Sequence, residues 1–175
     1  IYGAVQDITE RRQAEKELRE SEEKFRTLVE ESPLGISLIG INGHYKYVNP
    51  RFEEIFGYAI GDILTGQEWF KKAYPDDEYR KQVIKIWVED QQETGVGQAQ
   101  PRTFRVTCKD GSCKEIHFRS VSLKHQDQFV IYEDITERKR AEEALKKSHQ
   151  TFLTVLDGID ATIYVADMDT HEVLF

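Results

Sequence analysis

Small and apolar residues recur at alternating intervals of four and three in two highly charged segments of the chain. The two series are Ala14, Leu18, Ser21, Phe25 and Leu28, and Ala141, Leu145, Ser148, Phe152 and Val155. This heptad spacing predicts two amphipathic helices. Such a helix either folds back on its own domain or pairs with a second chain as a parallel coiled coil, and we favour the coiled coil.

The block between these helices has the pattern of strands and shorter helices. Strands are predicted at 35–39, 45–48, 103–108, 116–123 and 129–133, and helical segments at 50–56, 60–64, 68–73 and 75–94. Asn42-Gly43 and Asp110-Gly111 predict two hairpin turns. A change of apolar phase between Phe118 and Val121 predicts a bulge or a sharp twist. Two hairpins around a helical segment predict an α+β fold: a five-stranded antiparallel sheet with helices on one face, flanked by N- and C-terminal amphipathic helices.

A repeat sets the expected boundaries. Asp7-Ile-Thr-Glu-Arg recurs as Asp134-Ile-Thr-Glu-Arg, and the charged helix after each copy recurs with it. The predicted order is therefore the tail of a preceding unit with its last strand (1–8), a connector helix (9–31), a central domain (32–136), a second connector helix (137–158) and the start of a following unit (159–175). The parent chain is expected to hold at least three such units.

The composition restricts the kinds of partner and the cellular location that we expect. The net charge of −8 argues against a nucleic-acid or anionic membrane surface, which would need clustered Lys and Arg. The sequence contains no run of about 18 apolar residues that would predict a membrane span. We therefore expect no direct membrane contact in this segment and a cytoplasmic location, with a membrane-anchored parent as the open alternative. Cys108 and Cys113 are interpreted as reduced thiols on two arms of a hairpin, although a disulfide between them is the open alternative.

No catalytic or metal-binding motif stands out. The sequence has no Gly-x-Ser-x-Gly elbow, phosphate-binding glycine loop or His-Glu-x-x-His segment. The histidines do not fall at zinc spacing around the cysteines. We therefore expect neither an enzyme nor a metal site.

Several short motifs in the central block together resemble the PAS domain family. They are Gly35-Ile, Tyr47-Val-Asn-Pro-Arg-Phe with Phe56-Gly-Tyr, Trp69-Phe with Tyr74-Pro-Asp-Asp, Cys108-Lys-Asp-Gly, and Tyr132-Glu-Asp-Ile-Thr-Glu-Arg. The resemblance implies a sensory or signal-relay unit of a multi-PAS protein, with a sensor histidine kinase as the expected parent and a cyclic-dinucleotide enzyme as the alternative. The implied partners are a second copy in a homodimer, through the connector helices and the PAS flank, and neighbouring PAS and kinase domains.

The candidate signal-coupling residues lie where the last strand meets the outgoing helix. Asp134 or Thr136, and Asp7 or Thr9 in the first copy, can cap a helix N-terminus. The family resemblance implies that Asp134, Ile135 and Thr136 tie the last strand to the helix.

A candidate ligand cavity lies between the sheet and the helices. Its expected lining is Ile36, Leu38, Phe52, Phe56, Trp87, Phe104, Phe118 and Ile131. The alternative, which we favour, is that these residues fill a solid core and the domain is a ligand-free dimerisation spacer. The cofactor is unknown: segment 65–70 lacks the Cys of covalent flavin sensors, and 76–94 lacks the His of haem sensors. A non-covalent flavin or small metabolite stays open.

Overall fold

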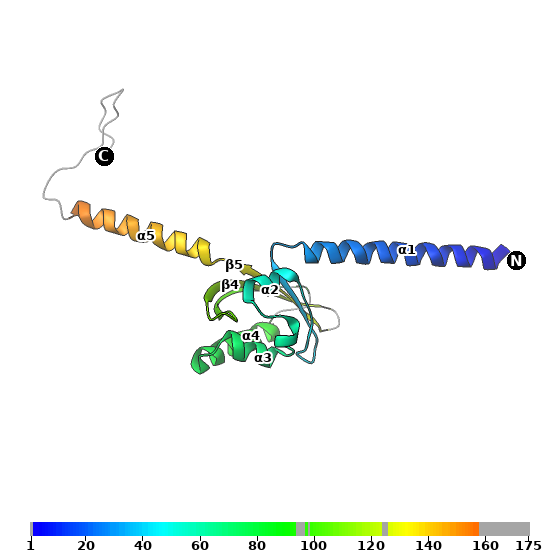
Figure 1. Cartoon of the computed structure of the whole chain (residues 1–175), viewed down its shortest axis with the longest axis horizontal. Coiled ribbons are helices and arrows are strands. Elements are labelled where there is room, and N and C mark those ends of the chain that lie inside the picture. The colour runs from blue at the N-terminus through cyan, green and yellow to red at the C-terminus, as the bar shows by residue number, and fades with distance from the viewer. Residues whose placement is uncertain (1, 94–96, 98, 124–125, 158–175) are drawn as a thin grey trace, which may run out of the picture. The chain divides into compact units, whose positions relative to one another are not determined.

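A five-stranded antiparallel sheet forms the centre of the fold (Figure 1). The computed structural model describes residues 2–93, 97, 99–123 and 126–157. The strands are β1 (Gly35–Ile39), β2 (Tyr45–Val48), β3 (Ala99–Thr107), β4 (Cys113–Ser122) and β5 (Gln128–Asp134), in the order β2-β1-β5-β4-β3. The last strand in sequence is therefore central and pairs on both sides. The predicted fold class is confirmed.

Two glycines make the hairpins. Gly43 and Gly111 have φ of 75° and 83°, a region that side chains with a Cβ rarely adopt. Gly43 N–H donates to the Gly40 carbonyl, which closes the turn between β1 and β2. Both hairpin turns lie where the Asn-Gly and Asp-Gly pairs predict them.

Three helices and a short 3-10 turn cover one face of the sheet (Figure 1). They are α2 (Pro50–Phe56), η1 (Ile60–Asp62), α3 (Gly66–Ala73) and α4 (Asp77–Glu93). Their apolar side chains form one core with alternate residues of the strands, including Phe52, Trp69, Val83, Ile116 and Tyr132, each at most 4% exposed. Truncating a buried Phe in such a core costs about 3–5 kcal/mol.

Of the two irregularities predicted near Phe118, the bulge is wrong, and the sharp twist stays a prediction. The pairing of β4 with β3 and with β5 runs without a register shift, from Phe118 through Val121. Val121 is only half-buried, so it does not have to turn its side chain into the core. The irregularity lies instead between Leu38 and Ile39, where β1 pairs with β2.

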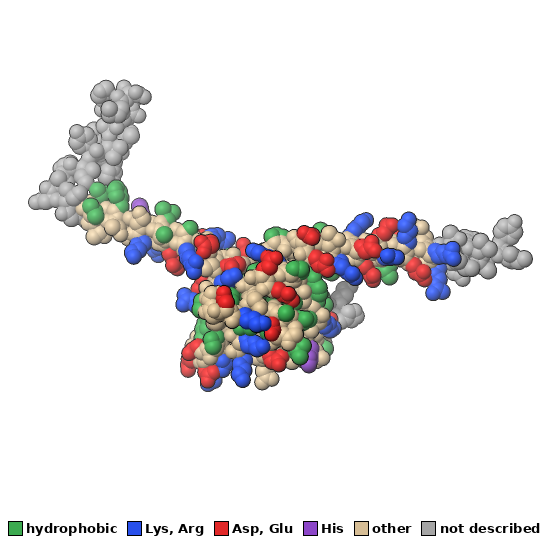
Figure 2. Space-filling view, viewed as in Figure 1, with side chains coloured by type: hydrophobic (Ala, Val, Ile, Leu, Met, Phe, Trp, Pro, Cys, Tyr) green, Lys and Arg blue, Asp and Glu red, His purple; other side chains and the backbone are tan. Residues whose placement is uncertain are grey.

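The N-terminal helix is longer than the sequence predicts. α1 spans Tyr2–Glu30, so residues 2–6 are helical and the strand expected there is wrong. A strand needs a partner for its backbone groups, whereas a helix satisfies its own. Charged pairs one turn apart support the helix, such as Arg11–Glu15 and Arg19–Glu23, and Figure 2 shows both charge signs interspersed along it. The assignment of residues 1–8 to a preceding unit stays a prediction.

A second unit, Thr136–Phe175, begins after β5. Its described part is one helix, α5 (Thr136–Asp157), close to the range predicted for the second connector. Leu145, Phe152 and Val155 of its heptad series are 73%, 59% and 54% exposed. Residues 159–175, predicted to start a following unit, lie outside the described residues. Within the described part of the chain, no helix has the length and hydropathy needed to cross a membrane.

Candidate functional site

Helix α2 is held at its N-terminus by one fully buried amide side chain. Asn49 Oδ1 accepts from the backbone N–H groups of Phe52, at 3.0 Å, and Ile36, at 2.7 Å. Its Nδ2 donates to the carbonyls of Val29 and Leu34, both at 2.9 Å. Asn49 is 0% exposed. It therefore joins the end of α1, the start of β1 and the cap of α2 in one group of hydrogen bonds.

The sequence explains the local geometry. Asn49 has extended backbone, which suits an N-cap, and Pro50 begins the helix where its missing N–H costs nothing. Arg51 adds an outer contact, because its Nε donates to the Pro33 carbonyl at 3.1 Å. The cap role of Asn49 is predictable from the Asn-Pro pair, but its bond to the incoming helix is not.

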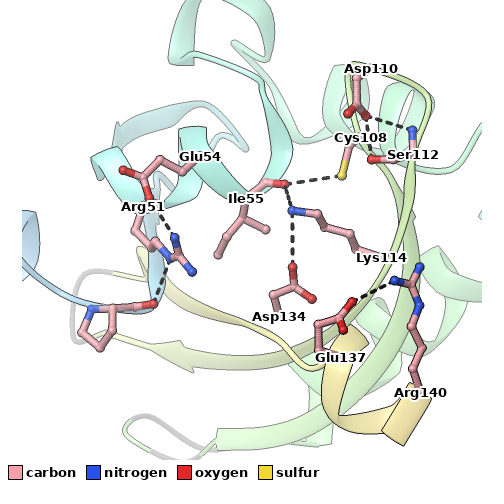
Figure 3. Close-up of polar contacts among 11 residues, drawn as sticks. Arg51, Glu54, Ile55, Cys108, Asp110, Ser112, Lys114, Asp134, Glu137 and Arg140 are labelled. Carbon is pink, nitrogen blue, oxygen red and sulfur yellow. Dashed lines mark hydrogen bonds and ion pairs between the residues drawn. The ribbon is translucent and has the colours of Figure 1, made fainter. Parts of the chain in front are cut away.

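The other end of α2 meets the hairpin between β3 and β4 (Figure 3). Lys114 Nζ donates to the Ile55 carbonyl at 2.8 Å and lies 3.3 Å from Asp134 Oδ2. Cys108 Sγ donates to the same carbonyl at 3.4 Å, and Lys109 N–H donates to the Phe56 carbonyl at 2.9 Å. A lysine at a helix C-terminus is favoured by the helix dipole. Lys114 thus connects α2 to the last residue of β5.

The predicted junction residues lie at the end of β5. Asp134 ends the strand, Ile135 is buried and donates its N–H to the Glu115 carbonyl at 2.9 Å, and Thr136 begins α5. Asp7 and Thr9 lie inside α1 rather than at its start, so their predicted capping role is wrong. The physical reason is that α1 continues through them to Tyr2. The contact between Lys114 and α2 was not predicted from the sequence. The alternation of side chains along β4 does not indicate which of them contacts a helix.

A cleft of about 820 Å³ opens between the helices and the same face of the sheet. Its lining includes Trp87 and Phe118, as the sequence predicts, and residues that were not predicted, among them Tyr45, Trp69 and Tyr132. Phe52, Phe56 and Phe104 belong to the buried core and not to this lining. The cleft and a packed core therefore coexist on this face.

Three residues predicted to line the cavity face the other side of the sheet. Ile36 pairs directly with Ile131, and directly paired residues share a face. Ile36 and Leu38 line a groove of about 490 Å³ with Phe25 and Val29 of α1. The neighbours of Ile36 in β1, Gly35 and Ser37, face the helices. Both sides of β1 are apolar or small, so its alternation did not reveal which face meets the core.

Buried hydroxyl groups of two neighbouring strands meet beside the cleft. Tyr132 Oη of β5 lies 2.8 Å from Ser37 Oγ of β1, within hydrogen-bond distance. Burial raises the pKa of Tyr132 to about 12, and burial raises the pKa of Tyr45 well above its usual value. Both tyrosines therefore keep their protons at neutral pH. The sequence marks them only as aromatic strand residues.

The cysteines do not pair in this structure. Cys108 is buried and Cys113 is exposed, and both are free. Burial raises the pKa of the Cys108 thiol, which keeps it protonated and unreactive. In the described part of the chain, His, Cys, Asp and Glu side chains form no group that could hold a metal ion.

Comparison with known proteins shows what the domain is similar to. The family model described as "PAS domain" matches residues 23–91. The fold resembles the PAS domain of an HTR-like protein from Haloarcula marismortui (TM-score 0.55, 20% identity, 71% of this chain and 99% of that chain). It also resembles a sensory box histidine kinase/response regulator structure from Burkholderia thailandensis (TM-score 0.54, 22% identity, 75% and 98%). These structures show that the domain has the PAS fold, and the PAS family model matches residues 23–91 of it.

Two curated proteins are also similar. The uncharacterized protein y4lL of Sinorhizobium fredii is 29% identical over 94% of this chain, and Sporulation kinase A of Bacillus subtilis is 28% identical over 82%. The chain spans about a fifth of their lengths, 20% and 23%.

Proposed function

We propose that this PAS domain is a signal-relay unit of a longer sensor protein, with a sensor histidine kinase as the parent. The observation that carries the proposal is the position of α2. Asn49 bonds one end of this helix to α1, and Lys114 bonds the other end to Asp134, which lies two residues before α5. The likeness to Sporulation kinase A supports the choice of parent. A kinase needs ATP, so we place the unit in the cytoplasm.

The relay works through small displacements of α2 and β5. Moving the end of α1 pulls on Asn49 through the Val29 carbonyl and shifts the cap of α2. The opposite end of α2 then shifts against Lys114, and the ion pair with Asp134 carries that shift to the end of β5. Packed elements of this kind change between discrete arrangements rather than deforming smoothly.

The proposed working form is a homodimer through the connector helices and the PAS flank. In α1, Leu18, Phe25 and Leu28 are 61%, 64% and 73% exposed, although they belong to one heptad series. The apolar groove with Ile36 and Leu38 continues from Phe25 onto the sheet. A coiled coil would cover this series, and Phe25→Glu is then expected to convert dimers to monomers in light scattering.

The junction is tested in the full-length parent. Asp134→Ala is expected to leave the domain folded while the output no longer responds to the stimulus. The matched control is Asp90→Ala, which removes a different ion pair, with Arg102 at 2.6 Å, outside the junction. A normal response by Asp134→Ala, or equal damage from Asp90→Ala, would overturn the proposal.

A second candidate function is direct ligand sensing, which the cleft beside Trp87 and Phe118 favours. A ligand-free spacer would leave this cleft without use. A cyclic-dinucleotide enzyme as parent would change the output domain but not the relay.

A further inference from the structure

Helix α4 carries a second apolar surface on its solvent side. Its inner side, with Val83, Ile86 and Trp87, packs on the core. On its outer side, Ile84 and Val88 lie one turn apart and are 36% and 45% exposed. The solvent side of a surface helix is normally polar. Among the described residues between 32 and 135, no other helix leaves a large apolar side chain exposed.

The apolar surface continues onto the neighbouring helix. α3 lies beside α4 (Figure 1), and the half-buried ring of Phe70 contacts that of Trp87, with centroids 6.2 Å apart. Trp87 directly precedes Val88 and borders the exposed pair, and Phe70 extends the surface towards α3. We call Phe70, Ile84, Trp87 and Val88 the α4 surface. A contiguous apolar surface with a polar rim is typical of a contact with another protein.

Two lysines flank the exposed pair. Lys81 and Lys85 each lie three residues before a member of the pair, which places them on the same side of the helix. Their aliphatic stems extend the apolar surface, and their ammonium groups form its rim. The rim is therefore basic, although the chain as a whole has a net charge of −8.

The acids of α4 do not cancel this basic rim. The pair of Lys85 with Glu89 is 3.8 Å long and exposed, and such a pair contributes little. Asp77 is paired with Arg80, and Glu78 lies more than one turn before the exposed pair. Lys81 has no ion-pair partner among the described residues.

These charges select the kind of partner. In a symmetric contact between two copies, the α4 surface would meet itself, so that lysines would face lysines. Such a juxtaposition of like charges is unfavourable. The connector helices of this chain are also a poor match, because Arg and Lys lie between their acids (Figure 2). An apolar stripe flanked by Asp or Glu suits both the exposed pair and the lysines.

We propose that the α4 surface docks an acidic amphipathic helix of a separate protein. That helix presents two apolar side chains one turn apart, flanked by Asp or Glu, which is the spacing that helix recognition uses. The groove with Ile36 and Leu38, where we place the dimer contact, lies on the other face of the sheet. A regulator therefore binds the α4 surface without displacing the second copy. The proposal does not rest on the relay through Asp134.

Docking is tested with two matched helical peptides. Each has about 18 residues with Leu at intervals of three and four, and its flanking positions are all Glu in one peptide and all Lys in the other. The amide NMR signals of the whole chain, residues 1–175, report where each peptide binds. The Glu peptide is expected to shift the signals of Ile84, Lys85 and Val88, and to bind at least about tenfold more tightly than the Lys peptide. About 0.5 M salt is expected to weaken its binding several-fold.

Four results would overturn the proposal. Two are equal binding of the two peptides and no shift at about 1 mM of the Glu peptide. The third is a set of shifts confined to α1 and α5, because the acidic helix would then pair with the connectors. The fourth is a shift of the Ile84 and Val88 signals with chain concentration alone, because a second copy would then cover this surface.

The basic rim is tested by reversing one charge. Lys81→Glu is expected to weaken binding of the Glu peptide about tenfold and to strengthen binding of the Lys peptide. The control is Arg119→Glu, at an exposed residue of β4 that pairs with Ile131 and so lies on the other face of the sheet. Both variants change the net charge equally, and equal effects of the two would overturn the proposal. Both residues are exposed, so the fold is expected to survive.

The apolar pair is tested in the same way. Val88→Gln is expected to weaken binding of the Glu peptide about tenfold, because the Val side chain no longer becomes buried in the contact. The control is Ile41→Gln, which replaces an exposed apolar residue in the turn between β1 and β2. Unchanged binding by Val88→Gln, or an equal loss from Ile41→Gln, would overturn the proposal. The comparison of the two peptides uses the wild-type chain, so it stands even if a variant does not fold.

Discussion

The two ends of α2 are held by opposite kinds of chemistry. At the N-terminus, a neutral and fully buried Asn49 makes four hydrogen bonds. At the C-terminus, the contacts are charged and partly exposed: the side chains of Lys114 and Asp134 are 28% and 24% exposed. A buried neutral network is costly to break and has one geometry. A partly solvated ion pair is weak and tolerates displacement. The helix thus has a fixed end and an adjustable end, which suits a relay.

Breaking the fixed end should have the largest effect. Asn49→Ala removes the cap of α2 and leaves the buried Ile36 N–H and the Val29 and Leu34 carbonyls without this partner. We expect a loss of about 3 kcal/mol or more in the free energy of unfolding, measured by urea denaturation. The control is Asn42→Ala, which removes an exposed turn contact to the His44 N–H and should cost less than about 1 kcal/mol. Similar losses for both variants would show that burial of Asn49 adds nothing.

Asn49→Asp separates the two roles of Asn49, which are to cap α2 and to bond to the end of α1. The carboxylate can still accept from Phe52 and Ile36, but it cannot donate to the carbonyls of Val29 and Leu34. The cap should therefore survive while the bond to α1 is lost. Hydrogen exchange is expected to quicken in the last turn of α1 more than in α2. Equal quickening in both helices would contradict this separation.

The sequence predicts elements better than it predicts contacts between them. The sheet and both hairpins follow from alternation and from Asn42-Gly43 and Asp110-Gly111, because these signals are local. The face of β1 does not follow, since Ile36 and Leu38 on one side look no less suited to a core than Ile39 on the other. Only the pairing with β5 and the position of α1 decide it.

The candidate site shows the same limit. Asn49 is readable as a helix cap from neighbouring residues, and the cap role of Asp134 stays a prediction. The contacts of Asn49 with Val29 and of Asp134 with Lys114 join residues 20 positions apart in each case, and no short-range pattern encodes them. The predicted start of α1 was wrong because it relied on a distant repeat. The Asp7-Ile-Thr9 repeat suggested a strand-to-helix junction, whereas the chain is helical from Tyr2 onward.

The adjustable end should give an effect of intermediate size. Lys114→Met keeps the apolar stem but removes the ammonium group from the Ile55 carbonyl and from Asp134. We expect a loss of about 1 kcal/mol, with a coupling to Asp134→Asn of about 0.5 kcal/mol in a double-mutant cycle. Urea denaturation of the four proteins measures it. A coupling of several kcal/mol would mean that this end is as rigid as the Asn49 end, and the contrast between the ends would be wrong.

The smallest effect should come from Asp62, which lies beside the same end of α2. The Lys109 ammonium, together with the Ala59 N–H, holds the pKa of the Asp62 carboxyl below its usual range. A lowered folded-state pKa means that the stabilisation is present above the unfolded value of about 3.9 and is lost as pH falls through the lower folded value. Asp62→Asn should therefore flatten the acid side of the melting-temperature profile slightly.

The salt dependence of the mutational costs distinguishes the charged end of α2 from the neutral end. Because Lys109 is exposed and Asp62 is partly exposed, about 1 M salt should remove most of the difference between Asp62→Asn and the wild type. The cost of Asn49→Ala should hardly change, since an amide carries no charge to screen. If salt reduced both costs equally, the neutral end would depend on electrostatics as much as the charged end does. The division of α2 into a fixed and an adjustable end would then have no physical basis.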